Sequence, residues 1–427
     1  MRAFPEPWEV LVKSEAERSV LAFVNSDYAD TPYDKWAADV GVQPNLLVSE
    51  AKFPQYQHVP GAVCVPDYLQ GGDAERAALD LAERMPPSAV IARMESDLLR
   101  AARLRELLGV PGQDFASTLA FRDKVHMKTL VRQSGLEVPE FAPVRVDFDL
   151  FGFVREHGYP VVVKPALGSG STGTQVLRGP ADLARLLAEG LPEHAEVERF
   201  VEGQMYVVDG LVAAGAPVAT FVSRYLNDCL SFHDGIYLGS AQLTRDHPLT
   251  DRLIGYARKV LDALPTPECA TFHLEVFHTP DDRLVLCEIG SRTGGALTAP
   301  AIHAATGFNL DEQWFRAQVA PQTLADASIH GVAPGRSAGW VVFYPERGTL
   351  AALPKSPPPF VVEERLRATV GTAYEGGVKS AHYLAAYVLT GADDQEVEQR
   401  AQELAQWYAA GVRWTGLHSE DDRPALN

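Results

Sequence analysis

Two glutamates that face each other across a predicted hairpin are the residues whose spacing most plainly suggests chemistry. The residues on either side of the turn 279–282 alternate apolar and β-branched side chains, which predicts two paired strands. With the turn centred between Asp281 and Asp282, Glu275 and Glu288 stand directly opposite each other, with Cβ atoms about 5 Å apart. Two like charges repel there unless a cation lies between them. Mg²⁺ binds carboxylate oxygens and nucleotide phosphates together, so the pair predicts a metal site.

The alternative for this glutamate pair is an ordinary solvated hairpin face. The expected same-face neighbours are poorly suited to water, since they are His273, Phe277, Leu286 and Gly290. Directly after the second strand, Arg292 is followed by Thr-Gly-Gly, which places a cation on flexible backbone. We therefore expect an anion-and-metal site at this end of the hairpin.

A glycine-rich loop provides a second candidate for phosphate binding. A predicted strand at 161–164 ends on Lys164, and the loop 168–173 follows with three glycines whose backbone N–H groups can wrap phosphate oxygens. The glycines match G-x-G-x-x-G, but a dinucleotide fingerprint opens a helix, whereas 175–178 predicts a returning strand. A Walker loop is excluded, because the Gly-Lys-Ser/Thr of that motif is missing here. A protein-kinase glycine loop is followed by its lysine, whereas here Lys164 comes before the loop. A glycine hairpin over phosphates remains, with a plain glycine-rich turn as the alternative.

Other charged residues are less informative by themselves. Lys124 and Lys128 lie four residues apart on a predicted helix at 121–135, a spacing typical of a solvated helix face. Residues 196–202 predict a strand in which Glu198 has apolar neighbours. Taken alone, Glu198 is more simply a surface residue than a site residue.

Four features follow one another along the chain: a lysine on a helix, a lysine before a glycine hairpin, a Glu-x-aromatic strand, and two glutamates on a later hairpin. This order resembles that of the ATP-grasp superfamily of ATP-dependent carboxylate–amine ligases. The resemblance implies that Lys124 and Lys164 neutralise the phosphates of ATP. It implies that Glu275 and Glu288 bind Mg²⁺, with Mn²⁺ as an alternative cation. Arg292 would hold the substrate carboxylate and the acyl phosphate made from it, so Arg292 and Lys164 are the expected catalytic residues.

The resemblance also implies an adenine pocket beside the phosphates. The glycine loop would close over the β- and γ-phosphates, and Glu198 would accept a hydrogen bond from the adenine amine. Main-chain atoms at Phe200 and Val201 would read the edge of the ring. The expected nucleotide-binding residues are Lys124, Lys164, Gly168, Ser169, Gly170, Ser171, Thr172, Gly173, Glu198, Phe200 and Val201.

Two positions depart from the pattern of the superfamily. Met205 stands where many members have a ribose-binding glutamate, and Gly290 stands where many have an asparagine that binds metal. Ser291 or water could replace that amide oxygen. The segment EIGSRTGGALTAP resembles members that join amino acids, including dipeptide ligases and carnosine-synthase-like proteins. We therefore expect an amino-acid or small-peptide ligase that forms peptide bonds and releases ADP.

Other functions remain open beside the amino-acid ligase. One is a carboxylase-like or nucleotide-precursor ligase of the same fold. Another is a non-catalytic ATP-binding regulator, in which Met205 and Gly290 would be signs of decay. The expected partners are small amino-acid or peptide substrates, with a homodimer as an open option. Arg224, His233 and His273 are candidates for contacts to the substrate, with a structural role as the alternative for each.

Composition limits the classes of partner. The 427 residues are 46% hydrophobic and 22% charged, as in a globular protein, and the formal net charge of −18 argues against nucleic-acid and anionic-membrane binding. No apolar run approaches the roughly 20 residues of a membrane span, and residues 1–18 lack the core of a signal peptide. The four cysteines have no paired spacing, which predicts neither disulfides nor a zinc site and suggests a cytoplasmic protein. They are Cys64, Cys229, Cys269 and Cys287.

The fold expected from these features combines α/β and α+β parts in an ATP-grasp architecture. Alternating strands and helices predict a parallel α/β domain at 1–117, including a helix at 97–108 capped by Asp97 and ended by Gly109. An ATP-grasp domain with a central antiparallel sheet is expected at 118–320, with a glycine-loop lid at about 140–202. A change of composition predicts a small C-terminal α+β appendage at 321–427. The strands expected in the first domain are 19–25, 45–48, 63–65 and 88–94.

Overall fold

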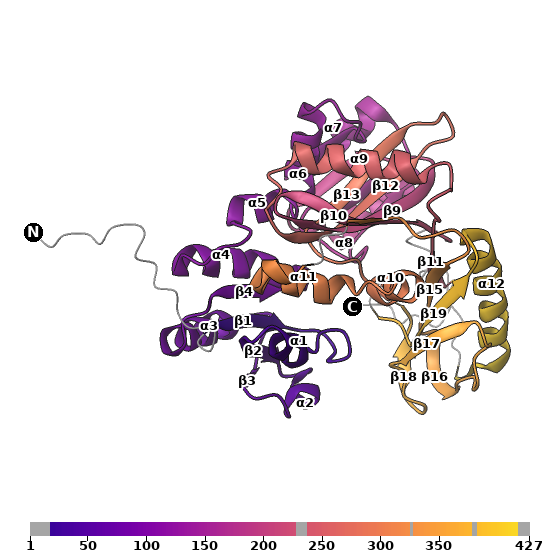
Figure 1. The fold of residues 1–427 in the computed structure, drawn as a ribbon. Helices are drawn as coiled ribbons and strands as arrows, with labels where there is room; N and C mark the ends of the chain where they lie inside the picture. Colours follow the sequence, from indigo (N-terminus) through magenta and orange to yellow (C-terminus); the bar gives the residue numbers. More distant parts are fainter. Residues whose placement is uncertain (1–17, 228–236, 325–327, 378–381, 417–427) are drawn as a thin grey trace, which may run out of the picture. The chain divides into compact units, whose positions relative to one another are not determined.

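The computed structural model describes residues 18–227, 237–324, 328–377 and 382–416. The chain, whose helices and strands are drawn in Figure 1, divides into two compact units. Unit 1 comprises Met1–Thr118, Pro267–Cys269 and Asp311–Asp326, as far as these are described. Unit 2 comprises the remaining segments, including most of the predicted C-terminal appendage. The three-domain division stays a prediction.

Unit 1 contains a four-stranded sheet in the order β3-β2-β1-β4, and every pairing in it is parallel. The run SVLAFV in β1 is buried at all six positions, as expected for a strand covered on both faces. This confirms the predicted parallel α/β architecture. The strands are β1 (Ser19–Val24), β2 (Gln43–Ser49), β3 (Ala62–Val65) and β4 (Ala89–Ala92). The helices are α1 (Tyr33–Asp39), α2 (Phe53–Tyr56), α3 (Asp73–Arg84), α4 (Leu98–Leu108) and most of α5 (Phe115–Ala120) and of α11 (Leu310–Val319).

The start of α4 differs from the sequence prediction. Gly109 ends the helix in a left-handed conformation, as expected, but the Asp97 side chain makes no capping hydrogen bond. Instead its Oδ2 accepts a hydrogen bond from the Tyr68 hydroxyl at 3.0 Å, and the residue is 0% exposed. The prediction that Asp97 caps the helix through its side chain was wrong, because the carboxylate turns toward the interior of the unit.

Unit 2 is built on a nine-stranded sheet in the order β13-β12-β9-β10-β11-β15-β19-β17, with β14 paired to β10. Neighbours along that order are antiparallel, which confirms the predicted central antiparallel sheet. The strands are β9 (Gln204–Ala213), β10 (Ala216–Tyr225), β11 (Leu238–Gln242), β12 (Ala270–His278), β13 (Leu284–Gly290), β14 (Ile329–His330), β15 (Ser337–Phe343), β17 (Val361–Leu366) and β19 (Ala385–Gly391).

Helices α6 (Lys124–Gln133) and α9 (Thr250–Ala263) share one hydrophobic cluster with strands of this sheet. The α6 helix begins three residues later than predicted, because the Asp123 side chain accepts hydrogen bonds from the N–H groups of Val125 and His126. That cap places Lys124 at the first helical position.

A second antiparallel sheet, in the order β5-β8-β6-β7, spans residues 141–199. It has its own hydrophobic cluster, to which α7 (Asp147–His157) and α8 (Pro180–Glu189) contribute. The returning strand predicted after the glycine loop is present as β7. The strands are β5 (Phe141–Val144), β6 (Val161–Pro165), β7 (Gln175–Leu177) and β8 (Ala195–Arg199).

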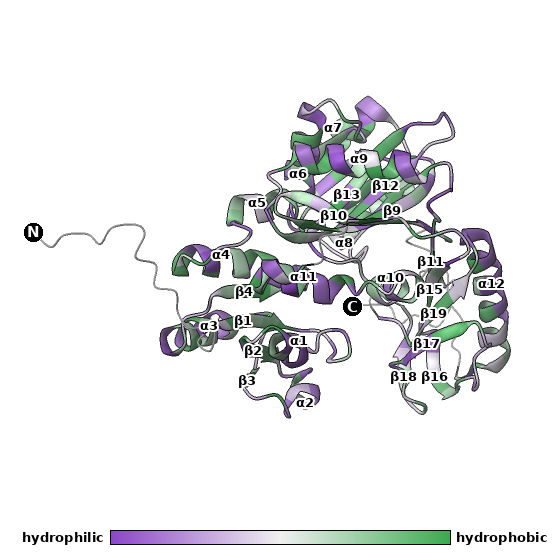
Figure 2. Ribbon diagram, viewed as in Figure 1, coloured by the Kyte–Doolittle hydropathy of each residue, from purple (hydrophilic) through white to green (hydrophobic). Residues whose placement is uncertain are grey.

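The C-terminal part of unit 2 adds a long helix and a small sheet. Helix α12 (Asp394–Gly411) is capped by the Asp393 carboxylate and packs on β15 and β19. Figure 2 shows much of α12 as hydrophilic and many sheet strands as hydrophobic, consistent with one solvent-facing side of the helix. The three-stranded sheet contains β16 (Arg347–Ala352), β18 (Ala373–Glu375) and β20 (Arg413–Thr415), and α10 (Thr298–Thr306) completes unit 2.

Some expectations concern residues outside the described ranges. They include His233, a substrate-site candidate, together with Cys229 and the first 17 residues. The described cysteines, Cys64, Cys269 and Cys287, are all unpaired. In the described ranges, no helix has the length and apolar character needed to cross a bilayer.

Candidate active site

The hairpin of β12 and β13 places Glu275 directly opposite Glu288, as the sequence predicted. The register shifts by one residue beyond this pair, so Val276 faces Leu286, and Phe277 faces Val285. The expectation that Leu286 shares a face with Phe277 and the two glutamates was therefore wrong, because Leu286 pairs with Val276 and lies with it in the hydrophobic core. A β-bulge at Cys287 supplies the extra residue, and an irregularity of this kind is common beside active sites.

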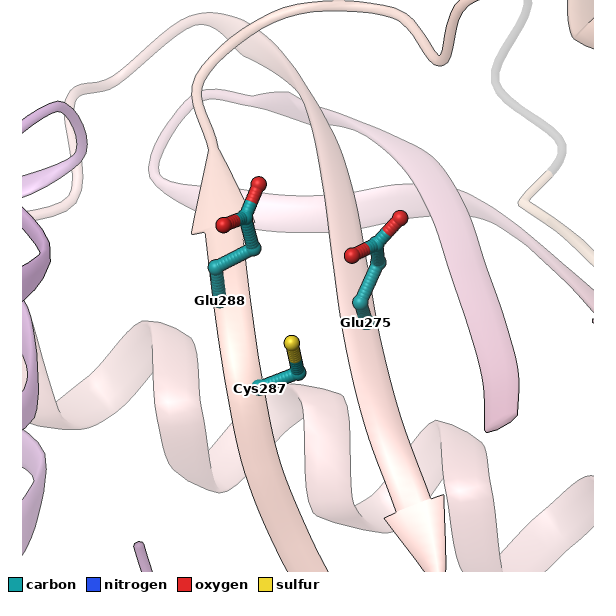
Figure 3. A group of neighbouring side chains, drawn as sticks. All are labelled: Glu275, Cys287 and Glu288. Atoms are coloured by element: carbon teal, nitrogen blue, oxygen red, sulfur yellow. The ribbon is translucent and has the colours of Figure 1, made fainter. Parts of the chain in front are cut away.

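The bulge places the Cys287 thiol beside the two carboxylates. One ligand atom from each of Glu275, Cys287 and Glu288 lies within 4.8 Å of the others (Figure 3). Figure 3 shows the two carboxylates rising from neighbouring strands on the same side. Hard oxygen donors suit Mg²⁺ and a thiol does not. Burial raises the pKa of the Cys287 thiol well above its usual value, so Glu275 and Glu288 are the residues that fit Mg²⁺.

Lys124 connects Glu288 to the glycine loop. Its Nζ lies 3.2 Å from Glu288 Oε2 and donates a hydrogen bond to the carbonyl oxygen of Gly168 at 2.8 Å. Burial acts to raise the pKa of the Glu288 carboxyl, but Lys124, Lys164 and Arg292 outweigh it and lower this pKa to about 2. Glu288 is therefore ionised near neutral pH, and the predicted phosphate lysine reaches both this candidate metal ligand and the loop.

The glycine loop joins the antiparallel strands β6 and β7 as a hairpin. Gly170 and Gly173 have φ values of 59° and 72°, the left-handed region that glycine adopts without strain. Thr172 N–H donates to Ser169 O at 3.2 Å, and Arg122 donates to Leu167 O at 2.6 Å. The loop is thus a defined turn whose base is attached to the start of α6.

Lys164 and Glu198 meet inside unit 2. Lys164 Nζ lies 2.8 Å from Glu198 Oε1, and both side chains are buried. Two sequence interpretations were wrong here: Glu198 is not a surface residue, and Lys128 is not on a solvated face. Lys128 is 0% exposed and pairs with both Glu196 and Glu198. Helical spacing alone could not reveal this, because both partners lie about 70 residues further along the chain.

Phe200 and Val201, whose main-chain atoms are expected to contact adenine, come directly after β8. Phe200 N–H donates to Pro160 O at 3.2 Å, so a contact to adenine from this residue would have to use its carbonyl oxygen. Val201 is partly buried, and Met205 lies on β9 opposite Phe277. The roles expected for Phe200 and Val201 stay predictions.

A buried histidine, His273, lies beside the candidate metal ligands; from sequence it was a candidate for substrate contact, with a structural role as the alternative. His273 Nδ1 lies 2.8 Å from Asp209 Oδ1, and its Nε2 lies 3.5 Å from Glu275 Oε1. Burial acts to lower the pKa of His273, but Asp209 and Glu275 outweigh it and raise the pKa to about 9. The Tyr225 hydroxyl donates to Glu275 Oε1 at 3.0 Å. Glu275 is therefore oriented by His273 and by Tyr225, a residue that the sequence pattern did not single out.

Arg292 follows β13 in a turn and is half-buried. Its Nη1 donates to Thr293 O at 3.0 Å, and its charge contributes to lowering the pKa of Glu288. Arg224, another substrate candidate, instead pairs with Asp394 and Glu398 of α12 at 2.7 Å each. Arg292 thus lies near the candidate metal ligand Glu288, and Arg224 belongs to an ion-pair network with α12.

The sequence is similar to those of ATP-dependent ligases. Residues 123–211 match the family described as the carbamoyl-phosphate synthase L chain, ATP binding domain. An L-arginine-specific L-amino acid ligase of Bacillus subtilis is 26% identical over 288 residues, covering 64% of this chain and 69% of that protein. A D-alanine–D-alanine ligase of Frankia casuarinae is 29% identical over 229 residues, covering 48% of this chain and 57% of that protein.

Solved structures show the same fold. An L-amino acid ligase from Bacillus licheniformis superposes with a TM-score of 0.77 and 18% identity, covering 93% of this chain and 99% of that one. The biotin carboxylase domain of a Hydrogenobacter thermophilus 2-oxoglutarate carboxylase, solved with MgADP and bicarbonate, gives a TM-score of 0.68 at 14% identity and covers 93% of this chain and 91% of that one. With two lysines, a glycine hairpin and paired glutamates on this architecture, the chain has the ATP-grasp fold, and its sequence is similar to those of ATP-grasp ligases.

Proposed function

We propose that this chain is an ATP-dependent, ADP-forming ligase that joins the carboxylate of an amino acid to an amine. The observation that carries the proposal is the connection Glu288–Lys124–Gly168, which ties a metal-binding carboxylate to a phosphate lysine and a glycine loop. The amino-acid ligases among the relatives support the substrate class.

The first step would activate the carboxylate. One of its oxygens attacks the γ-phosphorus of ATP, the bond to the ADP oxygen breaks, and an acyl phosphate forms. Lys124, Lys164 and the loop N–H groups would hold the phosphates in line for this transfer, which depends on positioning and electrostatics. Glu275 and Glu288 would hold Mg²⁺, which neutralises charge on the β- and γ-phosphates when bound.

The second step would form the amide. The amine attacks the acyl carbon, the carbon–oxygen bond to phosphate breaks, and inorganic phosphate leaves. Arg292 can pair bidentately with a planar carboxylate and stay near the acyl phosphate formed from it. The glycine hairpin of residues 168–173 would act as the lid that excludes water from this intermediate.

The metal site proposed here contains one unusual position. Gly290 supplies no side-chain ligand where the superfamily often has an amide. The Ser291 hydroxyl is buried and, in the described ranges, has no hydrogen-bond partner. We include it in the proposal as a replacement donor, directly or through water. A reducing cytoplasmic setting, supported by three unpaired cysteines, belongs to the same proposal, and a homodimer stays a prediction.

An ADP-release screen over pairs of amino acids tests the proposed function. With MgATP present, at least one pair should stimulate ADP formation above either amino acid alone, and mass spectrometry should show a product lighter than the pair by one water. Stimulation by bicarbonate with an amine, and by no amino-acid pair, would favour a carboxylase-like enzyme. Nucleotide binding without turnover in the complete screen would favour a regulator.

A further inference from the structure

Lys128 is a buried cation that the proposed mechanism does not use. It lies one helical turn after Lys124 on α6 and is 0% exposed. A buried ammonium group carries a large desolvation cost unless carboxylates surround it. Lys128 is thus a third lysine beside the two, Lys124 and Lys164, that are proposed to bind phosphate.

Four buried charged groups share one cluster, formed by Lys128, Lys164, Glu196 and Glu198. Lys128 Nζ lies 2.7 Å from Glu196 Oε1 and in close contact with Glu198 Oε2. Lys164 Nζ lies 2.8 Å from Glu198 Oε1 and 3.6 Å from Glu196 Oε1. The two oxygens of Glu198 are therefore divided between the two lysines. The charges balance, with two ammonium groups facing two carboxylates.

The balance would change when a nucleotide binds. For Lys164 to reach a phosphate, its ammonium group must give up part of its contact with Glu198. Lys128 comes from a different element and keeps both of its carboxylate contacts when Lys164 turns away. Without Lys128, two buried carboxylates would face Lys164 alone and would hold it away from the phosphates.

We propose that Lys128 is a positioning residue of the nucleotide site, the fixed counter-charge that leaves Lys164 available to bind phosphate. This inference rests on the proposed function, because it requires that Lys164 binds the phosphates of a nucleotide. Lys128 itself touches no nucleotide in this account and acts through Glu196 and Glu198.

A purely structural role for Lys128 makes a different prediction. Loss of a buried ion pair destabilises the fold whatever its effect on ligands, because one charge is left unpaired. A counter-charge role instead makes nucleotide affinity depend on the number of carboxylates left facing Lys164. Glu196 allows the two roles to be separated, since its Oε2 has no hydrogen-bond partner in the described ranges and its replacement by glutamine removes one negative charge from the cluster.

The test is calorimetric binding of MgADP to the full chain and to K128M, E196Q and K128M/E196Q. K128M should bind MgADP at least about tenfold more weakly than the wild type, a change readily measured by calorimetry. The balanced double variant should return to within about threefold of the wild type, and E196Q should bind no more weakly than the wild type. R224M is the matched control, because it removes a different ion-pair network of unit 2 and should leave affinity unchanged.

Three outcomes would overturn the inference. These are native affinity in K128M, a folded double variant that binds tenfold more weakly than the wild type, or an equal loss of affinity in R224M. If K128M alone does not fold, the double variant still decides between the two roles. Failure of the wild type to bind MgADP would instead overturn the proposed function and this inference with it, and unchanged binding in K164A would remove Lys164 from the phosphate site.

Discussion

Buried carboxylates behave in opposite ways in the two units. In unit 1, burial raises the pKa of Asp97 to about 6, although Arg100 and Tyr68 act to lower it. In unit 2, burial also acts on Glu288, yet three cations bring its pKa down to about 2. The Arg100 Nε atom is 3.7 Å from Asp97 Oδ1, too far for a hydrogen bond, whereas Lys124 Nζ approaches Glu288 Oε2 to 3.2 Å.

The difference shows what the cations of the candidate site accomplish. Burial alone favours a neutral carboxyl group, as at Asp97. A carboxylate that must bind a divalent cation has to stay charged, and the lysines and Arg292 keep Glu288 in that form. The same groups would neutralise ATP phosphates, so a single set of cations serves the site with and without nucleotide.

The largest effect is expected from Glu288→Gln, which removes the charge and keeps the shape. Amine-dependent ADP release should fall by about a hundredfold or more, because both the metal and the transferring phosphoryl group lose a preorganised charge. The melting temperature should also fall, because Lys124 loses its carboxylate partner, but the variant should remain folded since Lys124 keeps its hydrogen bond to Gly168 O. The exposed Glu140→Gln is the control, and retained turnover in Glu288→Gln would remove Glu288 from the metal site.

A smaller effect is expected where the loop of Arg292 packs against the buried pair of Asp209 and His273. A Cβ atom at Gly294 would lie 2.7 Å from both Asp209 Oδ1 and His273 Nδ1, whereas one at Gly295 would meet nothing within 4 Å. Gly294→Ala should therefore destabilise the fold by about 1–3 kcal/mol and lower turnover. Gly295→Ala should be close to the wild type in urea unfolding and in activity. Equal effects of the two substitutions would contradict this packing.

The smallest effect is a pH dependence at Asp97. Its folded-state pKa of about 6 lies above the usual 3.8, so the native state binds the extra proton and stability is lost as pH rises from about 4 through 6. Asp97→Asn cannot ionise and should gain stability relative to the wild type over this interval, by about 2–3 kcal/mol. Urea unfolding at pH 4, 5, 6 and 7 measures the difference, and a constant difference would mean that burial does not control this group.

Local sequence patterns predicted the parts of the site that depend on local geometry. The predicted pairing of Glu275 with Glu288 is present, but the strand pairs next to the turn are centred on Asp281 rather than between Asp281 and Asp282, and the bulge at Cys287 brings the two glutamates opposite each other. The glycines predicted the hairpin after Lys164. The bulge at Cys287 could not be predicted, because a one-residue insertion leaves the apolar alternation on each side intact. The burial of Lys128 depends on Glu196 and Glu198, far away in sequence, and its charge alone suggested a solvated face. Asp209 and His273 gave no motif, since their pairing arises from the neighbouring strands β9 and β12.

Transfer of oxygen from the substrate carboxylate to phosphate is the direct signature of an acyl-phosphate intermediate. The enzyme is incubated with MgATP, the amine identified by the ADP-release screen, and an amino acid labelled with ¹⁸O in its carboxylate. The released inorganic phosphate is then analysed by mass spectrometry. The acyl-phosphate route requires one ¹⁸O atom in each inorganic phosphate released, with ADP as the nucleotide product. Release of unlabelled phosphate, or formation of AMP and pyrophosphate, would contradict an acyl-phosphate intermediate.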